Sequence, residues 1–204
     1  MRKKSHISLA KFLMNNMKVD DLSEHKKAFY IGSILPDLKP SFITKKHSID
    51  QTFDTLTEEI KKITIDYDIN KGINGYYARH LGVITHYLAD YCTFPHNTVF
   101  GGTMTDHVYY EKALKFSLKE YVQRDDAQRE REQNHDSQSI EEIINFIKKT
   151  HKEYMKALKV VKVDIQYIVN LCYTVVDALL LFFEIAFNKF NAVKHKELMA
   201  VEVS

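Results

Sequence analysis

The sequence predicts an all-α fold, built as a single multi-helix domain that covers residues 1–204. Glycine and proline are scarce, with 6 and 3 copies among 204 residues, whereas all-β folds need many turns rich in both. Lys, Leu, Ala and Glu, which favour helices, are abundant. At this length the chain can bury a hydrophobic core of its own.

The spacing of apolar residues and the signals that begin or end helices place the individual elements. The first helix is expected to begin near Ser5, which is a suitable N-cap. The second must end at Leu35, because Pro36 disfavours helical geometry in the residue before it. The remaining helices are expected at about 53–63, 76–92, 105–122, 140–159 and 164–189.

Two segments differ from this pattern. Residues 123–137 hold many charges and no large apolar residue, so they are expected to form a charged, solvated loop or a fraying helix end. The most apolar stretch runs from Val175 to Phe187, but Asp177 and Glu184 interrupt it and it is short for a bilayer crossing. It is predicted to be a buried core helix and no stable membrane span, with association at a membrane surface left open.

Charge and cysteine content set further bounds. A formal net charge of +2 gives no strong attraction to nucleic acid or to an anionic membrane. Cys92 and Cys172 are too few for a disulfide framework, although a single bridge stays open. The first residues show neither an uninterrupted apolar run nor a small-residue cleavage site, so a cytoplasmic protein is expected.

Histidines and carboxylates with metal-ligand spacing gather in the first half of the chain. His86 and Asp90 are four residues apart on one predicted helix, so both side chains project from the same face. His107 and Glu111 repeat this spacing on the next helix. Each pair is therefore expected to bind one metal ion.

Two further positions extend this constellation. His96 directly follows Pro95 and adds a ligand from a loop. Gly82 lies one turn before His86 on the same face, where the missing side chain leaves room for a metal or for the close approach of another element. The other histidines lack acidic partners at useful spacing and are expected to be structural or exposed: His25, His135, His151 and His195. His80 either supports the metal ligands or caps a helix, or it has no role at the site, and the sequence favours neither possibility.

The donor types favour a catalytic zinc site over a structural one. Structural zinc usually recruits cysteines and closes its coordination shell, whereas this set offers imidazole nitrogens and carboxylate oxygens. Iron or manganese would also fit. A zinc ion acidifies bound water to near neutrality and holds phosphoryl oxygens, which suits phosphoester hydrolysis.

The ordered set of ligand candidates resembles the metal signature of the zinc-dependent phospholipase C family. The motif consists of HxxxD, five residues, a histidine, ten residues and HxxxE, and it comprises His86, Asp90, His96, His107 and Glu111. Upstream, His6 in SHISLA, Asp37 in GSILPDL and His47 fall in the order that the family uses for its remaining ligands. The resemblance covers roughly the first half of the chain and implies the helical fold shared by phospholipase C and P1 nuclease.

The resemblance implies two or three zinc ions and a role for each residue. One zinc is held by Asp37, His47, His86 and Asp90, and a second by His96, His107 and Glu111. Asp90 bridges to a third zinc near His6. Asp37 is also implied as the general base that orients or deprotonates the attacking water.

One departure from the family concerns the third zinc. Secreted members bind it through the amine and carbonyl of a processed N-terminal tryptophan, and this chain has no tryptophan. Lys3 and Lys4, close to His6, are expected to be solvated, with phosphate binding as the alternative.

The leading functional hypothesis is a zinc phosphoesterase that resembles phospholipase C and acts on a phospholipid head group or a small phosphodiester. A single-strand nuclease of the P1 type is the alternative enzyme, although the near-neutral charge gives a strand-binding groove little support. A non-catalytic metal-binding or regulatory protein on the same fold is the third. The sequence does not indicate the oligomeric state.

Overall fold

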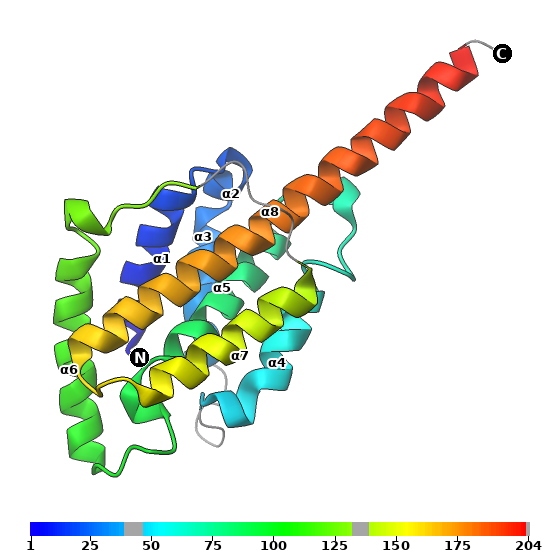
Figure 1. The fold of residues 1–204 in the computed structure, drawn as a ribbon. Helices are drawn as coiled ribbons and strands as arrows, with labels where there is room; N and C mark the ends of the chain where they lie inside the picture. Colours follow the sequence, from blue (N-terminus) through cyan, green and yellow to red (C-terminus); the bar gives the residue numbers. More distant parts are fainter. Residues whose placement is uncertain (39–46, 132–138, 203–204) are drawn as a thin grey trace.

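The computed structural model describes residues 1–38, 47–131 and 139–202, and within these ranges it contains eight α-helices and no strand (Figure 1). The all-α prediction is therefore confirmed. The helices are α1 (Lys3–Met17), α2 (Asp20–Glu24), α3 (Lys26–Ile34), α4 (Ile49–Lys61), α5 (Gly75–Tyr91), α6 (Met104–Tyr121), α7 (Ile140–Lys156) and α8 (Val161–Glu202). The described residues also form four 3-10 turns: η1 (Pro36–Leu38), η3 (Ile69–Lys71), η4 (Phe94–His96) and η5 (Asp125–Ala127).

Helix α5 forms the centre of the bundle. It packs against α3, α4, α8 and α1, and Leu81, Ile84 and Leu88 along it are fully buried. Helices α1 and α6 lie together on one side, while α8 crosses the bundle and continues beyond it toward the C-terminus (Figure 1). The part of α5 from Leu81 to Tyr91 is therefore buried inside the bundle.

Local signals in the sequence explain several helix ends. The Asn74 side chain accepts hydrogen bonds from the backbone amides of Tyr76 and Tyr77 and so begins α5. Thr103 and Asp106 form a reciprocal capping box at the start of α6. Helix α3 ends at Ile34, one residue earlier than predicted, and the chain then turns into η1.

The first helix does not begin where predicted. It starts at Lys3, with Arg2 as the N-cap, so Ser5 lies within the first turn. Ser5 is fully buried, and its hydroxyl has no hydrogen-bond partner among the described residues. The N-cap prediction was wrong because packing of the helix start into the bundle outweighs the local preference of serine.

Helix α8 is longer than predicted, since it continues to Glu202. Within the apolar stretch, five side chains are buried against the bundle: Val175, Val176, Leu179, Leu180 and Phe183. By length and composition alone, Val161–His195 would suffice to cross a membrane, yet 56% of its most apolar window is buried inside the protein. The two cysteines, Cys92 and Cys172, are free and buried.

Part of the segment 123–137 is anchored, in contrast to the solvated loop expected there. Ala127 is 2% exposed and joins the core. Arg131 pairs with Asp177 at 2.5 Å and with Glu184 at 2.7 Å. These contacts also give a partner to Asp177 and Glu184, the two acidic residues of the apolar stretch Val175–Phe187. Residues 132–138, which include His135, lie outside the described residues.

Glycines allow α3 and α5 to approach closely. A Cβ atom on Gly82 would lie 2.3 Å from the Phe29 carbonyl oxygen and 2.8 Å from the Ser33 amide nitrogen. One on Gly32 would lie 2.0 Å from the Arg79 carbonyl oxygen. Of the two readings of Gly82, the structure therefore supports the close approach of another element.

We predict that Gly82→Ala destabilises the fold, because the new methyl group meets backbone atoms that cannot rotate away. Overpacking of this kind costs about 1–3 kcal/mol, and the unfolding free energy should fall by at least that amount in urea titrations. Gly101→Ala is the matched control, since its Cβ has no atom within 4 Å. Equal unfolding curves for the two variants would show that the glycine contact is unimportant.

Candidate metal centre

Asp90 lies at the centre of the predicted ligand set. It projects from α5 into the bundle and is 0% exposed. Its Oδ2 atom lies 3.1 Å from His47 Nδ1 and 3.2 Å from His86 Nε2. Its Oδ1 atom lies 2.5 Å from the Met1 amine and 3.4 Å from His6 Nε2. The two oxygens of one carboxylate thus face two different groups of nitrogen donors.

The first group consists of His47, His86 and Asp90, whose ligand atoms all lie within 4.8 Å of one another. His86 Nε2 is 2.9 Å from His47 Nδ1. His86 Nδ1 is 2.9 Å from the Ser33 carbonyl oxygen, which can only accept, so Nδ1 carries the proton. The Nε2 lone pair then points to Asp90 and His47. Metal-binding histidines are commonly fixed in this way, by a hydrogen bond from the ring nitrogen that does not bind the metal.

Asp37 reaches the same group from η1. Its Oδ1 atom lies 3.7 Å from His86 Nε2 and 3.8 Å from His47 Nδ1. The Asp37 carboxylate is 6% exposed. The position of Pro36, which ends the helix before it, therefore places Asp37 at the edge of the centre.

The second group consists of His96, His107 and Glu111. Glu111 Oε1 lies 3.3 Å from His96 Nε2 and 3.4 Å from His107 Nε2. The His107 side chain is 28% exposed, whereas that of His86 is 0% exposed. The centre therefore opens to solvent on the side of α6.

A third group surrounds His6. This residue is 1% exposed, and its ring stacks on His86 with centroids 4.0 Å apart. Neither ring nitrogen has a hydrogen-bond partner within the described part of the chain. Its ligand atoms also group with those of Asp37 and His86. A buried imidazole without a partner is costly unless another ligand binds it.

The Met1 amine is a member of the centre that the sequence analysis did not include. Besides its contact with Asp90, it lies 2.9 Å from His96 Nε2 and 3.4 Å from Glu111 Oε1. Met1 is 4% exposed. The short distance along the chain between Met1 and His6 is the one sequence signal for this placement.

The carboxylates are held in their ionised form. Burial alone would raise the pKa of Asp90, but His96 and the Met1 amine outweigh it and keep the pKa well below its usual range. Burial also opposes ionisation of Glu111, yet the contact with His96 and the nearby amine lower its pKa to about 2. Both carboxylates are therefore negatively charged at neutral pH, the form that binds cations.

The nitrogen donors respond to the same environment. Burial, together with the neighbouring His86, lowers the pKa of His6 to about 3, so its imidazole is neutral and can bind a metal. Burial disfavours the charged Met1 amine, but Asp90 and Glu111 raise its pKa above the ordinary value. Burial raises the pKa of Asp37. A metal that binds the amine must therefore displace a proton.

The remaining histidines lie outside the centre. His80, which the sequence left open, forms an ion pair with Glu59, and Glu59 also pairs with Lys62 at 2.7 Å. This arrangement stabilises the contact between α4 and α5. The other described histidines are His25 between α2 and α3, His151 against Tyr91, and His195 on the surface.

Asp164 anchors the loop that carries His96, a connection that the sequence pattern did not reveal. It is 0% exposed at the start of α8. Its Oδ2 atom accepts from the Phe94 amide at 2.9 Å and from the Tyr110 hydroxyl at 3.0 Å, while Oδ1 accepts from the Tyr154 hydroxyl at 2.8 Å. One carboxylate thereby ties η4 and α6, the two elements of the second group, to α8.

The donor set fits zinc. It combines imidazoles and carboxylates without a thiolate, as catalytic zinc sites do. His6 adds a buried imidazole whose nitrogens no described residue satisfies. All eight predicted ligands lie at this centre: His6, Asp37, His47, His86, Asp90, His96, His107 and Glu111. Their binding of metal stays a prediction.

Fold and site together define a class of helical proteins in which histidines and carboxylates able to hold metal gather around one buried aspartate. The family model described as zinc dependent phospholipase C matches residues 5–159. The chain belongs to this family, which confirms the resemblance seen in the sequence. At the level of the family it is a zinc-dependent phosphoester hydrolase domain. Searches of the curated proteins and of the solved structures gave no match.

We predict that Asp164→Asn weakens zinc binding at the second group, because an amide NH₂ would face one of the three donors. Loss of such a supporting contact typically lowers metal affinity 10–100-fold, measurable by zinc titration against a competing chelator. The ligands on α5 should be unaffected. Tyr154→Phe is the control, since it leaves the bond from Phe94 intact and should cost about 1–3 kcal/mol of stability without lowering zinc affinity. Wild-type zinc affinity in Asp164→Asn would contradict the anchoring role.

Proposed function

We propose that this protein hydrolyses phosphoesters by the attack of water on phosphorus, with a phospholipid head group or a small phosphodiester as substrate. The observation that carries the proposal is the convergence of three ligand groups on Asp90, whose carboxylate is fully buried. Membership in the zinc-dependent phospholipase C family supports the same reaction class.

The residues divide into three ligand sets under this proposal. A first zinc would be held by Asp37, His47, His86 and Asp90, and a second by His96, His107 and Glu111. A third would be held by His6, Asp90 and the Met1 amine; His6 Nε2 and the amine lie 3.4 and 2.5 Å from Asp90 Oδ1. When bound, zinc supplies Lewis acidity, which acidifies water and stabilises charge on phosphoryl oxygens.

Asp37 is the proposed general base. It lies at the edge of the first group, with Oδ1 3.7 Å from His86 Nε2, and a carboxylate at this position would accept a proton from the attacking water. Burial raises the pKa of this carboxyl group, which increases its proton affinity. In the same group, the His86 ring is fixed by the hydrogen bond from its Nδ1 to the Ser33 carbonyl oxygen.

We predict that purified protein contains zinc and that His107→Ala loses an ion together with hydrolysis of a generic phosphodiester such as bis-p-nitrophenyl phosphate. Elemental analysis and release of nitrophenolate measure the two effects. His195→Ala is the matched control, because it deletes an exposed imidazole outside the centre. Asp37→Asn should lower kcat by about 10²–10⁴-fold, the usual contribution of a general base.

The outcomes separate the competing functions. Stoichiometric zinc without turnover of any ester would favour a non-catalytic metal-binding protein. Faster cleavage of single-stranded DNA than of phospholipid analogues would favour a nuclease of the P1 type. Absence of bound metal in wild-type protein would reject all three readings.

We further predict that the Met1 amine is a ligand of the third zinc. One glycine added before Met1 moves the primary amine out of the pocket, so the zinc content should fall by one ion per chain. The same glycine added at the other end of the chain should change nothing. His6→Ala should remove the same ion, and combining it with the extension should remove no further one. Full zinc content in the extended chain would exclude the amine as a ligand.

A further inference from the structure

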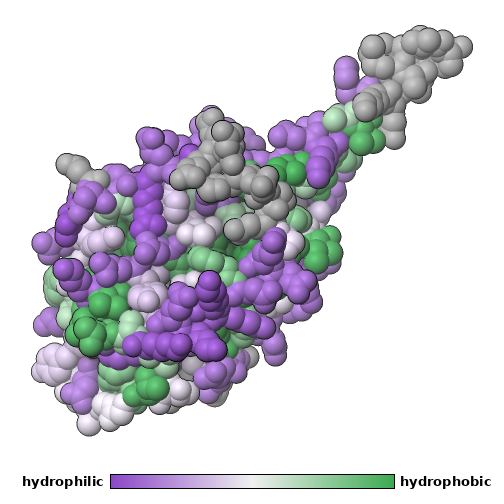
Figure 2. Space-filling view, in the orientation of Figure 1, coloured by the Kyte–Doolittle hydropathy of each residue, from purple (hydrophilic) through white to green (hydrophobic). Residues whose placement is uncertain are grey.

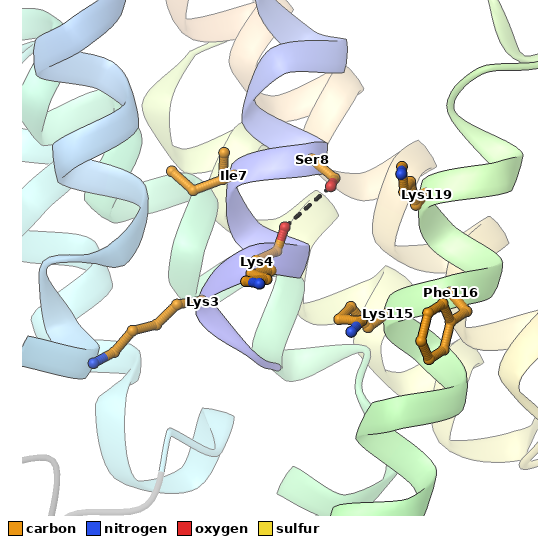
Figure 3. Close-up of a pocket in the computed structure, with 7 residues that line it drawn as sticks. All are labelled: Lys3, Lys4, Ile7, Ser8, Lys115, Phe116 and Lys119. Atoms are coloured by element: carbon orange, nitrogen blue, oxygen red, sulfur yellow. Dashed lines mark hydrogen bonds between the residues drawn. The ribbon is translucent and has the colours of Figure 1, made fainter.

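A groove lined by lysines lies between α1 and α6 (Figure 3). Its volume is about 470 Å³. Lys3 and Lys4 line it from α1, and Lys115 and Lys119 line it from α6, together with Ile7, Ser8 and Phe116. None of these lining residues is acidic. The groove and the flanking face of α6 are called the α1–α6 surface below.

Few acidic residues flank the groove lysines: α6 carries Asp106, Glu111 and Glu120. Helix α1 contains no acidic residue over Lys3–Met17. Among the described residues, no ion pair involves any of the groove lysines, and Lys115 Nζ lies 4.1 Å from the centroid of the Phe116 ring. Lys112 is exposed on the same helix and adds a fifth cation. The chain has a net charge of only +2, so this surface concentrates positive charge.

Large apolar side chains are exposed among these lysines. Met104 is 76% exposed, Val108 45%, Tyr109 66% and Phe116 56%. Figure 2 shows hydrophobic atoms surrounded by hydrophilic ones over α6. Helix α7 has a similar length, yet it contributes no exposed large apolar residue. Exposure on α6 is therefore a property of this surface and not of the helices in general.

The α1–α6 surface adjoins the metal centre. Val108 and Lys112 directly follow His107 and Glu111 in α6, so the ligands and this surface share two helical turns. The Arg2 side chain, at the start of α1, donates to the Val108 carbonyl oxygen at 3.1 Å. A partner on this surface would therefore reach the side where His107 opens the centre to solvent.

We propose that the α1–α6 surface docks onto anionic phospholipid bilayers. Lysines attract the anionic head groups, and Met104, Val108, Tyr109 and Phe116 enter the boundary between head groups and acyl chains, as on helices that bind in the membrane interface. Two of these four side chains are not aromatic, so they fit an acyl boundary better than a stack of nucleobases. The choice of phospholipid rests on the proposed function, whereas binding itself does not require turnover.

Sedimentation with vesicles tests the proposal. Wild-type protein should bind vesicles of phosphatidylcholine and phosphatidylglycerol and should bind pure phosphatidylcholine much more weakly. Each lysine near an anionic surface contributes a factor of about five, so Lys115→Gln with Lys119→Gln should lower partitioning roughly 25-fold. Lys152→Gln with Lys156→Gln is the matched control on the exposed face of α7, and its partitioning should be unchanged.

A second variant separates docking from simple ion exchange. Phe116→Ser keeps every charge and should also reduce vesicle binding, while melting curves and zinc content confirm that the fold is intact. Equal sedimentation with both vesicle types, equal losses in the α7 control, or stronger binding to single-stranded DNA than to vesicles would overturn the proposal. A protein that binds vesicles but hydrolyses no phosphoester would leave docking established and reject only the proposed function.

Discussion

The structure depends on the burial of one ionised carboxylate. Asp90 is fully shielded from solvent, and an isolated carboxylate in such a place would cost several kcal/mol. Five nitrogen-bearing groups lie around it: the Met1 amine, His6, His47, His86 and His96. The positive charge of the Met1 amine, 2.5 Å from Oδ1, offsets the charge of the carboxylate. Because these groups come from distant parts of the chain, they reach Asp90 only in the folded bundle.

Close packing of α3 against α5 fixes the positions of the ligand side chains. Gly32 and Gly82 let α3 approach α5 until backbone meets backbone, and Ser33 thereby presents its carbonyl oxygen to His86 Nδ1. A larger residue at Gly82 would separate the helices and free the imidazole to rotate. On the opposite side, Asp164 fixes the backbone beside His96. The ligand geometry is therefore set by atoms that bind no metal themselves.

The sequence alone predicts what depends on local spacing. The four-residue intervals His86–Asp90 and His107–Glu111 place each pair on one helix face, and the order of the ligands identifies the family. Contacts between distant segments leave no periodic signal. The pairing of Asp164 with the Phe94 amide spans 70 residues, and that of the Met1 amine with Asp90 spans 89. Neither follows from residue type, because both depend on how the helices pack.

The ligand candidates differ in their exposure to solvent. His6, His86 and Asp90 are almost fully buried, whereas the His107 side chain is 28% exposed. Buried ligands hold a cation firmly, since water cannot compete with them, but they leave no path for a substrate. The open ligand lies on α6, the helix that also exposes apolar and basic side chains next to it. Among the described ligands, the exposed His107 therefore marks the side of α6 as the path by which a substrate would reach the centre.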